Sequence, residues 1–259
     1  MCNAMSSFIN KVFTGCLLLG LFTVGSPLAD AMDAQQRVEA AFNYIRDKAS
    51  VCRLDMTIHR PEWQRTVTIK AWTRGEKDSL FIIIAPPKDN GNGTLKKDRE
   101  MWMYNPKINR VIKLPPSMMA QAWMGSDFSN NDLAKSDTLI QEYTHTITGT
   151  ETHEGKTVYL IDAIPKPEAP VVWGMQKLKI REDDLFLEQA FYDEDLKLVK
   201  KLKFLEIQTI DGKLYPKKWI MQNADEKEKY TVVEYKMLKF IKSLPDGFFT
   251  ISNLKNPKR

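Results

Sequence analysis

Histidine, cysteine and carboxylate side chains are the groups in this 259-residue chain that could perform catalysis or hold a metal ion. The chain has three histidines, His59, His145 and His153, and none lies in an H-E-x-x-H pattern. His153-Glu154-Gly155 is better explained as a hairpin turn, and no G-x-S-x-G sequence is present to form a nucleophile elbow. The sequence therefore predicts no catalytic residue, no metal site and no cofactor.

A second group of candidates resembles a phosphate-binding loop. The segment from Gly149 to Thr157 ends in Gly-Lys-Thr, but it has five residues between its glycines, where such a loop needs four. The run that follows, Val158-Tyr159-Leu160-Ile161, predicts a strand, whereas a phosphate-binding loop must open a helix. Nucleotide binding is therefore not expected. The adjacent carboxylates of Asp183 and Asp184 could take part in acid–base chemistry, but they are better explained as solvated turn residues.

One helix is predicted near the start of the domain, from Asp33 to Ala49. Val38, Ala41 and Phe42 fall on one apolar stripe of a helical period, together with Ile45 and Ala49. Asp33 is placed to act as the N-cap.

After this helix the apolar period changes to two, which is typical of strands. The candidate strands lie near residues 51–59, 63–73, 78–85, 99–104, 108–114, 138–148, 156–164, 173–182, 185–193, 196–209, 214–223 and 228–241. Turn sequences such as Arg74-Gly75, Glu154-Gly155 and Asp211-Gly212 separate them. Short strands joined by turns, without alternating helices, predict a meandering antiparallel sheet in a mainly β fold with few helices.

Several strands alternate well. Val67, Ile69 and Ala71 share one face of their strand, and Val233, Tyr235 and Met237 share a face of another. A sheet of eleven or twelve such strands curls strongly, so its apolar inner face must be covered. The few helices leave two possibilities, a barrel filled by its own side chains or a dry cavity for an apolar guest.

The irregular stretch from Pro115 to Lys135 bears on this choice. Met118, Met119, Ala122 and Trp123 have the spacing of one helical face, and large apolar residues follow at Met124 and Phe128. Methionine is common on surfaces that adapt to different apolar partners. The stretch is either a core plug or a lid that faces a ligand.

The first 31 residues are predicted to be a cleavable secretory signal. Lys11 precedes an apolar run from Val12 to Gly25, and Ala29-Asp30-Ala31 supplies the pattern that signal peptidase accepts after Ala29 or Ala31. Residues 32–259 then form a single domain in which Cys52 is the remaining cysteine, so we expect no internal disulfide. A weak lipobox at Cys16 lies too early in the run, which favours a free periplasmic protein over a lipoprotein.

The net charge of +5 is a mild excess, with lysines and acids interspersed along the strands. It favours approach to anionic lipid head groups, and the absence of a concentrated basic stripe argues against nucleic-acid binding.

Four motifs resemble one protein family. They are residues 101–106 (MWMYNP), 111–115 (VIKLP), 123–133 (WMGSDFSNNDL) and 244–249 (LPDGFF). The chain resembles the LolA-like outer-membrane lipoprotein-sorting proteins, and Met-Gly-Ser-Asp-Phe is the most specific part of this resemblance. The resemblance implies an open half-barrel of about eleven antiparallel strands, wrapped around the N-terminal helix and short lid helices, in the periplasm. We identify no match to the single barrel arginine of the lipoprotein chaperone that typifies the family, so the cargo stays open between lipoproteins and other lipids.

The leading hypothesis is a non-catalytic carrier that binds lipid, or the acyl chains of a lipoprotein, and moves it toward the outer membrane. The residues expected near its mouth or lid are Trp102, Tyr104, Met118, Met119, Trp123, Met124 and Phe128. A monomer is expected, with an inner-membrane transporter and an outer-membrane acceptor as partners. The alternative is a periplasmic sensor domain of the same fold that binds an envelope signalling or transporter protein.

Overall fold

The computed structural model describes residues 32–257, and the predicted signal peptide lies outside the described residues. Helix α1, Ala34–Arg46, is capped as the sequence predicts. The Asp33 carboxylate accepts from the backbone amide of Gln36 at 2.8 Å, and the Gln36 side chain accepts from the amide of Asp33 at 3.0 Å. The helix ends at Arg46, earlier than expected, because Asp47 takes φ 56°.

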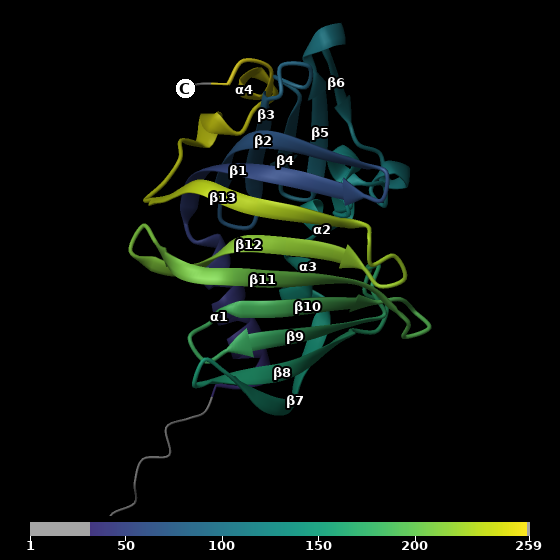
Figure 1. Ribbon diagram of the computed structural model, residues 1–259, viewed down its shortest axis with the longest axis vertical. Coiled ribbons are helices and arrows are strands. Elements are labelled where there is room, and N and C mark those ends of the chain that lie inside the picture. Colours follow the sequence, from purple (N-terminus) through teal and green to yellow (C-terminus); the bar gives the residue numbers. More distant parts are fainter. Residues whose placement is uncertain (1–31, 258–259) are drawn as a thin grey trace, which may run out of the picture. The chain divides into compact units, whose positions relative to one another are not determined.

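The described residues form one antiparallel sheet of 13 strands, ordered β6-β5-β4-β3-β2-β1-β13-β12-β11-β10-β9-β8-β7 (Figure 1). The strands are β1 Ala49–Arg60, β2 Trp63–Arg74, β3 Asp78–Ala85, β4 Gly93–Lys97, β5 Glu100–Asn105, β6 Arg110–Lys113, β7 Tyr143–His153, β8 Lys156–Pro165, β9 Met175–Arg181, β10 Phe186–Tyr192, β11 Leu198–Ile210, β12 Lys213–Asn223 and β13 Tyr230–Ile241. Each strand pairs with its neighbours in the chain, except that β1 also pairs with β13 and leaves β6 and β7 as the two edges.

Residues 114–142 connect these two edge strands and lie across one face of the sheet. This connection carries η2 Pro116–Met118, η3 Trp123–Gly125, α2 Asn130–Ala134 and α3 Thr138–Gln141. The remaining short helices are η1 Pro106–Ile108, η4 Asp246–Phe248 and α4 Ile251–Lys255. In Figure 1, α1, α2 and α3 lie behind the sheet, and we call the face that they cover the inner face.

The two faces of the sheet have separate apolar clusters. The inner cluster joins α1 and the 114–142 connection to side chains from most of the strands, including Ile69, Ala71 and Leu178. The outer cluster covers β1 to β6, where Trp72, Leu80 and Leu95 pack beneath the C-terminal tail. The sheet is therefore a half-barrel with a helix-covered inner face and a locally capped outer face.

Three details differ from the sequence-based expectation. Strand β4 is additional, because Gly93–Lys97 is too short to show an alternating pattern beside its Gly/Asn-rich turn. The strand expected at 138–148 begins only at Tyr143, since 138–141 forms α3. Met237 does not share the face of Val233, because a bulge in the β1–β13 pairing shifts the alternation and leaves Met237 39% exposed. Within residues 32–257, none of the helices is long and apolar enough for a membrane crossing.

Candidate functional site

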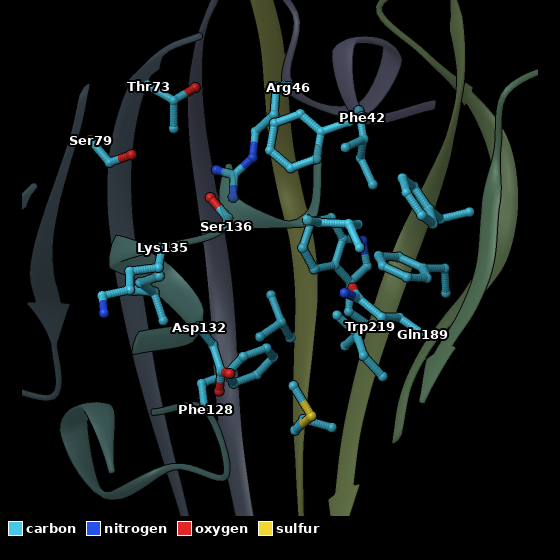
Figure 2. Close-up of a pocket in the computed structure, with 18 of the residues that line it drawn as sticks. Phe42, Arg46, Thr73, Ser79, Phe128, Asp132, Lys135, Ser136, Gln189 and Trp219 are labelled. Atoms are coloured by element: carbon cyan, nitrogen blue, oxygen red, sulfur yellow. The ribbon is translucent and has the colours of Figure 1, made fainter. Parts of the chain in front are cut away.

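A cavity of about 240 Å³ lies on the inner face, between the sheet, α1 and the 114–142 connection (Figure 2). About 10–15 Å³ of such space is enough for one water molecule, so the side chains leave far more room than a packing defect does. The aromatic residues that line it are Phe42, Phe81, Trp123, Phe128, Tyr143, Trp173, Phe186, Phe191, Phe204, Tyr215, Trp219 and Tyr235. A lining of this kind suits an apolar ligand.

Strands β10 to β13 supply the densest part of this aromatic wall. Trp219 packs against Phe204 and Tyr235 with ring centroids 5.0 and 5.6 Å apart. Tyr215 packs against Tyr235 at 5.4 Å and directs its hydroxyl to the backbone carbonyl of Ile45 at 3.3 Å. Burial raises the pKa of Tyr215 and of Tyr235, so both phenols stay neutral and the wall carries no charge.

Cys52, the one cysteine among the described residues, lines the cavity from β1. Burial raises the pKa of its thiol to about 12. The side chain is therefore a small apolar group at neutral pH rather than a nucleophile.

The seven residues expected near the mouth or lid lie in three different places. Trp123 and Phe128 line the cavity. The methionines at 118, 119 and 124 pack against the inner cluster without lining the cavity. Trp102 and Tyr104 lie on the outer face in the cluster beneath the C-terminal tail, because β5 turns Met101 and Met103 inward instead.

The most specific sequence motif, at 124–128, forms a turn that attaches the connection to the sheet. Met124 and Gly125 take φ of 53° and 78°, and the Ser126 hydroxyl closes the turn by donating to the carbonyl of Trp123 at 2.7 Å. The turn directs Phe128 into the cavity and leaves Asp127 against the strands.

Asp127 holds three strands at once. Its carboxylate accepts from Arg60 of β1 at 3.1 Å, from Asn223 of β12 at 3.1 Å and from Thr231 of β13 at 2.6 Å. A few residues later, the buried Asp132 forms an ion pair with Lys200 of β11. Both carboxylates are almost fully buried, so these contacts fasten the 114–142 connection over the cavity.

The histidines do not converge on a site. His59 stacks on Tyr230 with ring centroids 4.3 Å apart, and His145 Nδ1 lies 2.6 Å from the side-chain oxygen of Gln35. Burial lowers the pKa of His145, so its ring is neutral at pH 7. His153 ends β7 at the hairpin turn that the sequence predicts. Among residues 32–257, no group of three potential ligands is placed to hold a metal ion.

Sequence reasoning missed the aromatic wall of β10 to β13 and a polar part of the cavity that includes Arg46 and Lys135. The period-two alternation in these strands is the signal that could have identified the wall. No local signal marks Arg46, which ends an amphipathic helix as an ordinary polar residue.

Several solved structures have the same fold. A DUF1329 family protein from Desulfovibrio piger is 25% identical, with a TM-score of 0.76 over 86% of this chain and 99% of that chain. A putative outer membrane lipoprotein-sorting protein domain from Vibrio parahaemolyticus is 21% identical, with a TM-score of 0.73 over 86% and 100%. A LolA superfamily protein from Nitrosomonas europaea is 21% identical, with a TM-score of 0.70 over 86% and 99%.

No curated protein matches the sequence. Residues 75–256 match a family model described as "Uncharacterized protein". Because this match covers more than half of the chain, the protein belongs to that family, and it has the LolA-like fold of the outer-membrane lipoprotein-sorting proteins that its motifs resemble.

Proposed function

We propose that this protein is a non-catalytic periplasmic carrier that binds the acyl chains of a lipid or a lipoprotein. The observation that carries the proposal is the cavity of about 240 Å³, which is lined mainly by apolar and aromatic side chains. The names of the structural relatives, among them a lipoprotein-sorting protein domain, support the same class of ligand.

The energetics suit a carrier rather than a storage protein. Each buried methylene contributes about 0.8 kcal/mol, but the membrane offers an acyl chain the same burial. Loading is therefore close to an exchange, and a donor or acceptor protein must set its direction. We propose that an inner-membrane transporter and an outer-membrane acceptor are these partners and that the carrier acts as a monomer.

The 114–142 connection is the proposed lid. It runs between the two edge strands and contributes Trp123 and Phe128 to the cavity. Apolar packing in the inner cluster and polar contacts at Asp127 and Asp132 hold it, and it is not a strand of the sheet. Polar attachments of this kind can open without breaking the sheet.

Lipid extraction from gently purified protein, followed by mass spectrometry, tests the proposal together with uptake of a fluorescent acyl probe. Ala71→Trp fills the cavity from β2, whereas Lys70→Trp adds the same side chain on the outer face of the same strand. We expect extracted lipid and probe uptake in the wild type and in Lys70→Trp, and a loss of both in Ala71→Trp. Absence of lipid and of probe uptake in the wild type would contradict the proposal.

A further inference from the structure

One end of the apolar cavity is polar. Strands β1, β2, β3 and β4 place Ser50, Thr73, Ser79 and Lys96 in register, one beside the next, on the inner face. The first three line the cavity, and the Ser50 and Thr73 hydroxyls are 2.7 Å apart in a hydrogen bond. A row of polar side chains facing inward on four adjacent strands contrasts with the mainly aromatic wall of β10 to β13, where Gln189 is a polar lining residue.

Two cations and a further hydroxyl face this row from the helical side. Arg46 comes from the last turn of α1, and Lys135 and Ser136 come from the link between α2 and α3. Figure 2 shows Arg46, Lys135 and Ser136 on the same side of the cavity as Thr73 and Ser79, away from Trp219, with the Arg46 guanidinium directed toward Ser136. We call Arg46, Lys135, Ser136 and the three hydroxyls of the row the polar corner.

The charges of the polar corner are not balanced from within the protein. Among residues 32–257, neither the Arg46 guanidinium nor the Lys135 ammonium has a carboxylate within 4.0 Å, whereas Asp132, which also lines the cavity, is paired with Lys200. The Ser136 hydroxyl is buried and has no hydrogen-bond partner among the described residues. Buried polar groups are normally satisfied, so this set of donors is suited to an acceptor that enters the cavity.

Lys96 adds to the positive potential behind the row. Its ammonium group is buried and donates to the backbone carbonyl of Glu76. Burial, and next the charge of Arg46, lower its pKa to about 8, against smaller opposing effects of the Asp137, Glu76 and Asp78 carboxylates. The nearby carboxylate of Asp137 is held by Arg99 at 3.2 Å, outside the cavity lining.

We propose that the polar corner binds the anionic end of an acyl ligand, a carboxylate or a phosphate, while the chain lies against the aromatic wall. This inference rests on the proposed carrier function and narrows its ligands to anionic amphiphiles. Arginine and lysine supply charged donors, and the hydroxyls supply the neutral donors that complete the coordination of an oxyanion.

Displacement of a fluorescent acyl probe by three ligands with the same C16 chain tests this assignment. They are palmitate, palmitoyl lysophosphatidylglycerol and the uncharged monopalmitoylglycerol. We expect the purified protein to bind at least one anionic ligand about tenfold more tightly than the uncharged one, since a hydrogen bond to a charged group commonly changes affinity by that factor or more. Tighter binding of palmitate than of monopalmitoylglycerol identifies a carboxylate site. Tighter binding of the lysophospholipid than of monopalmitoylglycerol identifies a phosphate site.

Arg46→Gln and Lys135→Gln should each reduce the affinity for the anionic ligand about tenfold and leave that for monopalmitoylglycerol unchanged. Arg53→Gln is the matched control, because Arg53 is an exposed arginine on β1 with no ion pair among the described residues. Lys135 lies in the lid connection and Arg46 in α1, so instability of one variant leaves the other as the test. Equal wild-type affinity for charged and uncharged ligands would overturn the polar corner alone, whereas failure of all three ligands to bind would overturn the carrier function as well.

Discussion

Asp127 and Thr231 are 104 residues apart in the chain and are joined by two hydrogen bonds. The Thr231 hydroxyl donates to the Asp127 carboxylate at 2.6 Å, and the backbone amide of Asp127 donates to the same hydroxyl oxygen at 3.0 Å. Together with the ion pair to Arg60, they attach the lid connection to β13 and β1 at the middle of the sheet. The stability of the lid should therefore depend on this carboxylate.

Asp127→Ala should lower the free energy of unfolding by about 3 kcal/mol, because it leaves the largely buried Arg60 cation without its partner. Urea denaturation measures the loss, and hydrogen exchange of residues 124–133 should accelerate in the same variant. Glu100→Ala is the control, since the Glu100–Lys113 pair is exposed on both sides and its loss should cost less than about 1 kcal/mol. Equal losses in the two variants would show that Asp127 does not anchor the lid.

Cys52 should react slowly with iodoacetamide. With the pKa of its thiol at about 12, little thiolate is present at pH 8, so alkylation should be at least roughly a hundredfold slower than for a free cysteine. Mass spectrometry of the Cys52 peptide measures the rate in the folded protein, and the urea-unfolded protein is the control. A bound acyl chain should slow alkylation further, because Cys52 lines the cavity. A folded-state rate equal to the unfolded one would contradict the buried position.

Lys96→Met should stabilise the protein at pH 7. Burial lowers the pKa of Lys96 from 10.5 to about 8, so charged Lys96 destabilises the fold by on the order of 3 kcal/mol at most. Between pH 8 and 10.5 the unfolded chain holds this proton and the folded chain does not, so the stability of the wild type rises with pH across that range.

The difference between Lys96→Met and the wild type should therefore shrink as the pH rises from 8 to 10.5, as measured by urea denaturation at several pH values. Lys97→Met is the matched control, because Lys97 is the next residue on β4 and is exposed. A difference that stays constant over this pH range would disprove the lowered pKa.

Phe249→Ala should lower the free energy of unfolding by about 3 kcal/mol and leave acyl-probe uptake unchanged. The ring is 1% exposed and belongs to the outer cluster, on the opposite face of the sheet from the cavity. Ile251→Ala in the same tail should cost less than about 1 kcal/mol, since Ile251 is 43% exposed. Loss of probe uptake in a folded Phe249→Ala protein would contradict the separation of the two faces.

Local features of the fold could be predicted from the sequence because their causes are local. The Asp33 cap depends on a residue three positions away, and the buried set Val67, Ile69 and Ala71 depends on the alternation of one strand. The hairpin at Glu154-Gly155 depends on two residues with positive φ. These patterns were enough for a mainly β, meandering antiparallel sheet with one long helix, and the family resemblance implied the half-barrel.

The candidate site was predicted only in part. Trp123 and Phe128 follow from the apolar composition of the lid connection, and both line the cavity. Trp102 and Tyr104 are also large and aromatic, but the alternation of side chains along β5 places them on the outer face. There they lie beneath the C-terminal tail, which follows them by 140 residues or more in the chain. In the same way, a β-bulge opposite Arg53 shifts the alternation along β13, so Met237 does not share the face of Val233.

The sequence by itself determined the type and order of most elements and the apolar character of the lid, since periodicity and turn chemistry act over a few residues. The tertiary structure decided which strand faces line the cavity, that Asp127 joins the lid to three strands, and that Arg46, Lys135 and Ser136 lie on the same side of the cavity. These relationships depend on pairing between segments far apart in the chain, above all β1 with β13, and their register is set by contacts that no local pattern encodes.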